Sequence, residues 1–195
     1  DDEPELTRAL ARLLQAEGFA VHAYNSAGAF LARATPADVG CVVLDVAMPD
    51  LDGLALQQRL AHLPGLVVVF LTGHGDLSMA VATVKNGAWD FLEKPFQDNQ
   101  LVDKVEAACQ EAVVLQTESQ AKWRFQQALA ALSQREREVL DELLQGHYNK
   151  NIADHLGITP RTVEFHRANI FEKLQVQSAV ELAHLMGRYA PGSGA

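Results

Sequence analysis

The sequence lacks any long hydrophobic run. No stretch of its 195 residues approaches the roughly 18 apolar residues that a membrane-spanning helix needs, and no basic-then-apolar leader stands near residue 1. Cysteine is scarce as well. We interpret the two present, Cys41 and Cys109, as buried thiols of a reducing compartment, because both stand in apolar contexts. We therefore expect a cytoplasmic protein without membrane contact.

Positive charge is also in short supply, since the formal net charge is −9. Residues 1–110 carry 15 acidic and 7 basic side chains, whereas residues 132–195 carry 8 acidic and 7 basic ones. An acidic region binds polyanions poorly but can gather cations. The last third is close to neutral, so its charge alone does not indicate a nucleic-acid partner.

Residues 1–110 alternate strand-like and helix-like patterns. The strand-like segments are 20–24, 41–45, 66–71 and 91–92. The two middle ones are almost continuously apolar, which is typical of parallel strands buried on both faces. Pro4 can occupy the first turn of a helix that Gly18 ends, and Asp76 can cap another that Gly87 ends. The alternation predicts an α/β domain with a doubly wound parallel sheet.

From Asp98 onward the pattern is helical throughout. A narrow apolar seam with spacings of 4, 3, 4 and 3 comprises Leu101, Val105, Ala108, Ala112 and Leu115. We expect a helical linker over residues 111–131, an all-α domain of four helices over 132–190 and a flexible tail over 191–195. Helix signals in the all-α domain are the capping-box patterns of residues 133–136 and 178–181, the stops Gly146 and Gly157, and the cap Thr159-Pro160.

Two of these helices meet at a tight glycine turn, the geometry that places a second helix in the major groove of DNA. On the second helix, Val163, Ile170 and Leu174 share one stripe and should face the core. Phe165 lies on the opposite face near Ala168, which suits contact with thymine methyl groups and base edges. Packing of Phe165 on a neighbouring helix stays open as the alternative.

Chemically useful side chains stand where the predicted strands end. Asp45 ends one strand, Thr72 follows the next, and Lys94 follows the last. Asp1 and Asp2 stand before the first helix. Because ligands bind beyond the carboxyl ends of parallel strands, this edge can offer a divalent-cation site, a nucleophile and donors for a phosphoryl group. The plainer alternatives are a capping role for Asp45 and a backbone-bonded hydroxyl for Thr72.

Several pieces of the sequence agree in type and order with one family. They are Asp1-Asp2-Glu3-Pro4, residues 45–53 (DVAMPDLDG), Thr72-Gly73 and residues 87–96 (GAWDFLEKPF). Together they resemble the flavodoxin-like receiver domain of two-component response regulators over residues 1–110. The resemblance implies that Asp45 accepts a phosphoryl group and that Mg²⁺ is held by Asp1, Asp2, Asp45 and the backbone carbonyl of Ala47.

The same resemblance implies roles for three further residues. Lys94 would pair with the phosphoryl oxygens, Thr72 would move to bond one of them, and Phe91 would rotate inward with it. Simple core packing of Phe91 stays open as the alternative. The Lys94–Pro95 peptide is expected to be cis, as in that family.

One feature departs from the family. Its members carry an apolar strand immediately before the acidic pair, in the middle of a sheet of order 2-1-3-4-5, and this chain starts at Asp1 without that first strand. Its absence would leave neighbouring strands unpaired, at about 1–3 kcal/mol for each buried backbone group. We expect the chain to be a fragment of a longer gene product, which an intact-mass measurement of the natural protein would check.

Residues 132–187 resemble the LuxR-type helix-turn-helix, so the whole chain resembles the NarL/FixJ class of response regulators, in particular FixJ-like members. This implies a transcription regulator, not an enzyme, that is phosphorylated by a histidine kinase, dimerises and binds promoter DNA. It also favours activation, with RNA polymerase as a further partner. The DNA-binding residues implied are Asn149, Lys150, Arg161, Thr162, Glu164, Phe165, His166, Arg167, Ala168 and Lys173.

Two other function classes deserve comparison. Aspartate-nucleophile phosphatases carry a second acid two residues after the nucleophile, where this chain has Ala47, and turnover of phosphate esters would be needed to revive that reading. An interaction scaffold that binds protein or RNA would fail to select a two-fold site in duplex DNA. The seven histidines show no metal-ligand spacing with the cysteines, so we expect no zinc.

Overall fold

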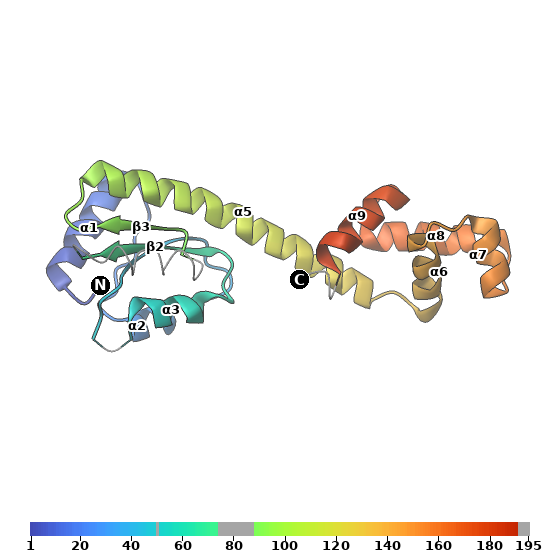
Figure 1. Cartoon of the computed structure of the whole chain (residues 1–195), viewed down its shortest axis with the longest axis horizontal. Coiled ribbons are helices and arrows are strands. Elements are labelled where there is room, and N and C mark those ends of the chain that lie inside the picture. Colours follow the sequence, from blue (N-terminus) through green and yellow to red (C-terminus); the bar gives the residue numbers. More distant parts are fainter. Residues whose placement is uncertain (50, 74–87, 191–195) are drawn as a thin grey trace. The chain divides into compact units, whose positions relative to one another are not determined.

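A computed structural model of the chain describes residues 1–49, 51–73 and 88–190 (Figure 1). Its internal contacts divide it into two compact units, residues 1–118 and 119–195. Helix α5 (Asp98–Ala130) contributes residues to both units. The helix predicted between Asp76 and Gly87 and the tail after residue 190 lie outside the described residues.

The first unit contains a parallel sheet in the order β1-β2-β3, as predicted. The strands are β1 (Gly40–Asp45), β2 (Leu66–Thr72) and β3 (Asp90–Glu93). In the pairing, Asp45 lies opposite Leu71, and Thr72 lies opposite Glu93. The carboxyl ends of the three strands therefore meet at one edge of the sheet.

Helices cover both faces of this sheet, which makes it doubly wound. Val68 and Phe70 pack in the cluster that includes α2 (Ala27–Leu31) and α3 (Gly53–Leu60). Their neighbours in β2 point the other way, toward α1 (Pro4–Ala16) and α5. Because the strand buries alternate residues on opposite faces, β2 must be apolar along almost its whole length.

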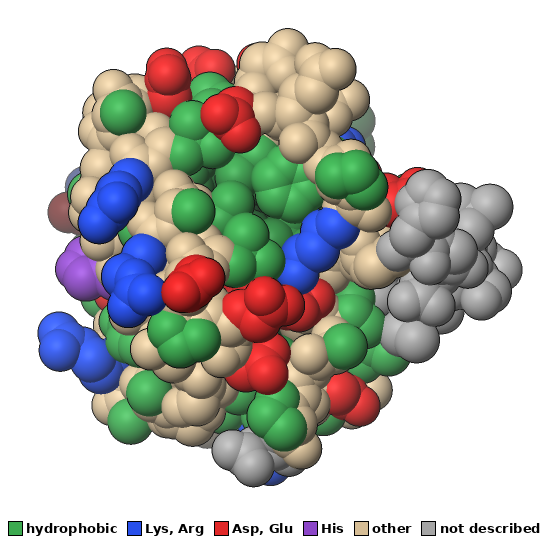
Figure 2. Space-filling view, turned by 90° about the vertical axis from the view of Figure 1, so that its left-hand side faces the viewer, with side chains coloured by type: hydrophobic (Ala, Val, Ile, Leu, Met, Phe, Trp, Pro, Cys, Tyr) green, Lys and Arg blue, Asp and Glu red, His purple; other side chains and the backbone are tan. Residues whose placement is uncertain are grey.

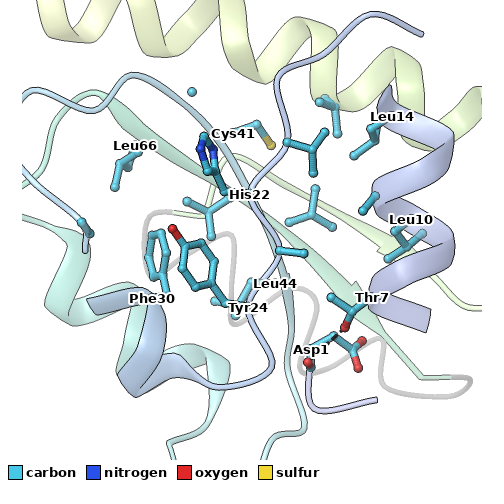
Figure 3. A pocket seen from close by; sticks show the side chains of 18 of the residues that line it. Asp1, Thr7, Leu10, Leu14, His22, Tyr24, Phe30, Cys41, Leu44 and Leu66 are labelled. Atoms are coloured by element: carbon cyan, nitrogen blue, oxygen red, sulfur yellow. Dashed lines mark hydrogen bonds between the residues drawn. The ribbon is translucent and has the colours of Figure 1, made fainter. Parts of the chain in front are cut away.

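The strand predicted over residues 20–24 is wrong. This segment has no regular secondary structure and lines a cavity of about 600 Å³ (Figure 3). Val43 and Leu44 of β1 line the same cavity, together with Leu10 and Leu14 of α1. Ala20, His22 and Ala23 are exposed, and a strand also requires a backbone partner, which none of the described residues supplies.

The apolar seam of α5 is correct at four of its five positions. Leu101, Val105, Ala108 and Ala112 are buried, but Leu115 is 38% exposed and the next residue, Gln116, is buried in its place. The Gln116 side-chain amide donates a hydrogen bond to the Pro36 carbonyl at 2.9 Å. This bond satisfies the amide nitrogen of the buried side chain, whereas its Oε1 has no hydrogen-bond partner among the described residues.

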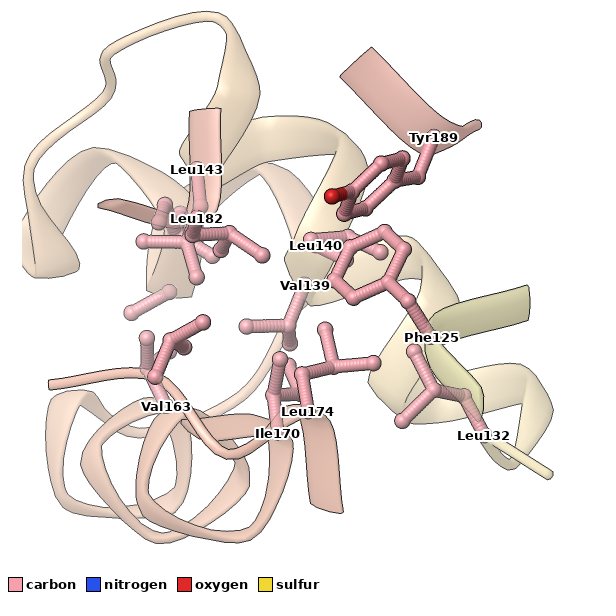
Figure 4. Close-up of a cluster of buried hydrophobic side chains, with 13 residues drawn as sticks. Phe125, Leu132, Val139, Leu140, Leu143, Val163, Ile170, Leu174, Leu182 and Tyr189 are labelled. Carbon is pink, nitrogen blue, oxygen red and sulfur yellow. The ribbon is translucent and has the colours of Figure 1, made fainter. Parts of the chain in front are cut away.

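The second unit contains the four helices that were predicted, and it also includes the end of α5, which the sequence assigned to a linker. The four helices are α6 (Gln134–Leu144), α7 (Asn149–Leu156), α8 (Pro160–Leu174) and α9 (Ala179–Tyr189). Figure 4 shows their shared core, in which Val163 and Ile170 face Val139 and Leu182. The long α5 joins through Phe125, whose ring lies 6.0 Å from that of Tyr189.

Most predicted helix ends in this unit are confirmed. Ser133 and Glu136 form a capping box, and Thr159 caps α8. The second predicted capping box is only half present. Ser178 caps α9, but the Glu181 carboxylate accepts from the Gln177 N–H rather than from the Ser178 N–H. Among the described residues, no helix is both long and apolar enough to cross a lipid bilayer.

Candidate functional site

The structure brings Asp45 and Lys94 together at the carboxyl edge of the sheet. Asp45 Oδ2 lies 3.3 Å from Lys94 Nζ, and Asp1 Oδ2 lies at the same distance from this ammonium. The Asp1 and Asp45 side chains are largely buried, at 5% and 11% exposure. The Lys94 ammonium therefore links the end of β1 with the segment before α1.

Asp2 completes an acidic cluster around this ammonium. Asp1, Asp2 and Asp45 each offer a carboxylate oxygen, and these oxygens lie within 4.8 Å of one another. Asp1 is held in place through its second oxygen, Oδ1, which accepts from the Glu3 N–H at 2.8 Å. Figure 2 shows acidic side chains gathered beside a basic one, next to a hollow lined by hydrophobic side chains.

Thr72 lies at the same edge, at the end of β2, and is 2% exposed. Its carbonyl accepts from the Lys94 N–H at 2.8 Å, which fixes the backbone of the lysine relative to β2. The Lys94–Pro95 peptide is cis, as predicted. Ala47 stands in the exposed loop two residues after Asp45. The edge of the sheet that carries the Asp45 carboxylate is therefore also bordered by Thr72, Lys94 and Ala47.

Phe91 lies opposite Phe70 in the sheet and is half-buried. It packs beside the cluster on the α2–α3 face, so its ring contributes to the core in this conformation. The preceding residue, Asp90, pairs with Lys104 of α5 and accepts from the Phe91 N–H. Phe91 thus stands on a short strand whose backbone is anchored to α5.

Gly53 has a role that its sequence position only hinted at. A Cβ built at this residue would lie 2.6 Å from the Asp45 carbonyl oxygen and 2.7 Å from Phe70 Cε1. The Gly53 N–H also donates to the Val46 carbonyl at 3.0 Å. The absence of a side chain therefore lets α3 begin directly against the end of β1, where Asp45 stands.

In the second unit, α8 presents the predicted face to solvent. Val163, Ile170 and Leu174 are buried, whereas Phe165 is 62% exposed. Phe165 therefore does not pack in the core, and its exposed neighbours on α8 are Arg161, Glu164 and Ala168. Lys150, near the start of α7, is also exposed.

Other predicted DNA-binding residues already have partners within the unit. Arg167 donates to Asn149 Oδ1 and lies over the Phe171 ring at 5.6 Å. The Thr162 hydroxyl bonds that of Thr159 at 2.8 Å. His166 is half-buried with its ring against Phe165, and its Nδ1 has no hydrogen-bond partner within the described part of the chain.

Lys173 is engaged most strongly, because its ammonium lies 2.9 Å and 2.7 Å from the two oxygens of Glu136. The hydrogen bond from Lys173, together with that from the Ser133 N–H, lowers the pKa of the Glu136 carboxyl to about 2. The positive charge of Lys173 is therefore largely neutralised before any DNA phosphate approaches.

Comparisons with known proteins agree with both halves of this geometry. The model of the response regulator receiver domain matches residues 1–106, and that of the bacterial regulatory proteins of the luxR family matches residues 130–186. The transcriptional regulatory protein FixJ of Azorhizobium caulinodans is 42% identical over 100% of this chain and 94% of that protein. FixJ of Rhizobium meliloti is 40% identical over 98% of this chain and 95% of that protein.

Solved structures lead to the same family. The response regulator StyR matches with a TM-score of 0.82 at 38% identity, over 97% of this chain and 96% of that chain. Full-length FixJ from B. japonicum matches with a TM-score of 0.57 at 39% identity, over 97% of this chain and 94% of that chain. With a receiver domain and a LuxR-type domain in one chain, the protein belongs to the response regulators of two-component systems and is a phosphorylation-regulated DNA-binding transcription regulator.

Proposed function

We propose that Asp45 accepts the phosphoryl group from a phosphohistidine of a sensor kinase, and that this modification controls promoter binding by the second unit. The observation that carries the proposal is the position of Asp45 beside Lys94 and Asp1, at the carboxyl edge of the parallel sheet. An Asp45 carboxylate oxygen bonds to phosphorus, and the phosphorus–nitrogen bond of the phosphohistidine breaks. The leaving imidazole keeps the electron pair and takes up a proton.

The residues around Asp45 supply alignment and charge, which are the main requirements of phosphoryl transfer. The Lys94 ammonium is within reach of oxygens bound at Asp45 and would pair with the added negative charge. The Thr72 hydroxyl, on the neighbouring strand end, would bond another oxygen. The Phe91 ring would move together with the Thr72 hydroxyl and alter the surface near β3. This change of surface would transmit the phosphorylation signal beyond the site.

The carboxylates also fit a hard divalent cation. Three carboxylate oxygens within 4.8 Å of one another face one ammonium, so the cluster keeps an excess of negative charge. Oxygen ligands of this kind suit Mg²⁺, and we assign Asp1, Asp2, Asp45 and the Ala47 carbonyl as its holders. When bound, Mg²⁺ would neutralise charge on the transferring phosphoryl group.

Labelling with a small phosphodonor tests the assignment of Asp45. With acetyl phosphate and Mg²⁺, the wild-type chain should gain one acid-labile, hydroxylamine-sensitive acyl phosphate, measured by intact mass. Asp45→Asn should lose it, whereas Asp52→Asn should keep it, because Asp52 is an exposed helix cap that bonds the Ala55 N–H. Retention of the modification in Asp45→Asn would contradict the proposal.

We further propose that phosphorylation promotes dimerisation and activation at promoters, with α9 as the pairing helix. The near-neutral second unit makes few phosphate contacts available to one copy, so a second copy would supply the missing affinity. Sedimentation of the phosphorylated chain should show a shift toward dimer, and selection from genomic fragments should return two-fold sites. An unchanged monomer would reject the dimerisation step.

A further inference from the structure

Two histidines and a glutamate converge in the second unit. Glu142 stands near the end of α6, His147 follows that helix, and His155 stands in the last turn of α7. Both imidazole Nδ1 atoms lie 2.7 Å from the same oxygen, Glu142 Oε2. The two rings meet edge to face, with centroids 5.1 Å apart.

The backbone between the helices fixes this convergence. Gly146 has a φ of 81°, the left-handed conformation that ends α6. Its N–H donates to the Leu143 carbonyl at 3.0 Å, and the His147 N–H donates to the Glu142 carbonyl at 3.3 Å. This pair of bonds is the Schellman pattern of glycine-terminated helices. It places His147 over Glu142 without any contribution from the side chains themselves.

The donor set suits a borderline-soft cation. Two imidazole nitrogens and one carboxylate oxygen within 4.8 Å are the ligands of zinc sites that keep an open fourth position. The last turn of a helix carries partial negative charge, which favours a cation beside it. Glu142 supplies the carboxylate oxygen on which both imidazole nitrogens converge.

The site is also open to ions from solution. The Glu142 side chain is 18% exposed, while those of His147 and His155 are 32% and 50% exposed. Zinc–nitrogen bonds of about 2.0–2.1 Å in a tetrahedral arrangement hold donors about 3.3 Å apart. Each imidazole nitrogen would therefore move several tenths of an ångström away from the Glu142 oxygen, which partly exposed side chains can do by small rotations.

We propose that Glu142, His147 and His155 bind one transition-metal ion of the Zn²⁺ class, with water as the fourth ligand. The bound ion would link α6 to α7 and so restrict the conformation of the turn between them. Asn149, the first residue of α7, follows this turn directly and bonds Arg167 of α8. Metal occupancy would thus stabilise the start of the helix-turn-helix. The sequence expectation of no zinc rested on cysteine spacing, which this site does not use.

Equilibrium dialysis of the untagged chain, residues 1–195, against Zn²⁺ tests the proposal. Saturating Mg²⁺ should occupy the proposed carboxylate site around Asp45, and metal analysis should then find one Zn²⁺ per chain. His147→Gln and His155→Gln should each weaken binding at least about tenfold, since even outer-shell changes commonly cost that much. His184→Gln is the matched control, an exposed histidine of α9 that should leave Zn²⁺ affinity unchanged.

Two further measurements separate metal binding from a purely structural role. Co²⁺ should give visible absorption bands in the wild-type chain that Zn²⁺ abolishes and that the His147→Gln/His155→Gln double variant lacks. Glu142→Gln should weaken Zn²⁺ binding while leaving the circular dichroism of the metal-free chain unchanged. Failure of the wild type to bind Zn²⁺, or undiminished binding by the folded double variant, would overturn the proposal.

Discussion

The Glu136 carboxylate receives both the Lys173 ammonium, at 2.7 Å, and the backbone N–H of Ser133, also at 2.7 Å. One side chain therefore ties the start of α6 to the last turn of α8. Because α8 carries the exposed Phe165, this link helps to set how the proposed DNA-reading helix is held.

Replacing Glu136 with Gln should destabilise the second unit by about 1.5–3 kcal/mol at pH 7, since hydrogen bonds to a charged group are lost. The matched control is Glu138→Gln, which removes an exposed pair with Arg135 and should cost well under about 1 kcal/mol. Urea denaturation followed by circular dichroism measures both. Equal losses in the two variants would contradict the role of Glu136.

The same carboxylate predicts a pH dependence. Its folded-state pKa is lowered to about 2 from an ordinary value of 4.5, so its ionised form favours the folded state. This stabilisation is fully present above pH 4.5 and is lost as the pH falls toward 2. The difference in unfolding free energy between wild type and Glu136→Gln should therefore shrink over that window. A difference that stays constant to pH 2 would show that another contact is responsible.

Gly53→Ala should destabilise the first unit by about 1–3 kcal/mol, because its methyl group would overlap backbone and aromatic atoms that cannot easily move. It should also slow labelling of Asp45 by acetyl phosphate, because the strand end must shift. Gly28→Ala in α2 is the control, since a Cβ there meets nothing within 4 Å. That change should be neutral or slightly stabilising in thermal unfolding. An equally tolerated alanine at residue 53 would show that α3 can move away.

Phe165→Ala should relax sequence choice on DNA more than it lowers non-specific affinity, because the exposed ring suits contact with base methyl groups. Binding to selected and scrambled duplexes, compared by fluorescence anisotropy, measures the two effects. Trp123→Ala removes another aromatic side chain with the same 62% exposure, from α5, and should leave sequence choice intact. A uniform loss across sequences would instead indicate a defect in folding.

The Cys41 thiol should resist alkylation near pH 8. Burial raises its pKa to about 12, so almost none of it is thiolate at that pH. Mass spectrometry after iodoacetamide treatment of the native chain should find residue 41 unmodified, and modified once urea unfolds the protein. The Cys41→Ala variant identifies any adduct at Cys109. Rapid native labelling of Cys41 would show that the cavity beside β1 opens readily.

Sequence reasoning placed three side chains of the proposed phosphorylation site at one edge of the sheet because they stand at strand ends. Asp45, Thr72 and Lys94 are far apart in the chain, but a parallel sheet must bring such positions to one edge. Sequence reasoning failed at positions whose structure depends on which other residues lie nearby in the fold, because the local sequence pattern does not contain that information. Residues 20–24 have the composition of a strand and lack a backbone partner within the described ranges, while Gln116 replaces Leu115 in a seam that spacing assigned to apolar residues.

The histidine cluster was missed for a different reason. Glu142, His147 and His155 have no regular spacing, and a glycine-terminated turn plus the packing of α7 on α6 bring them together. Gly146 was the available signal, since it predicted the turn. Sequence alone could not show on which side of that turn the imidazole rings would fall.

The hydrogen bond from Gln116 to Pro36 also has a mechanical consequence. Apolar seams tolerate axial slip, because a helix displaced by one turn, about 5.4 Å, presents similar side chains to the same groove. Such a displacement would carry the Gln116 amide away from the Pro36 carbonyl and break their hydrogen bond, which contributes about 0.5–1.5 kcal/mol. Within the first unit, this hydrogen bond therefore favours one position of α5 along its own axis. Gln116→Leu would remove that preference.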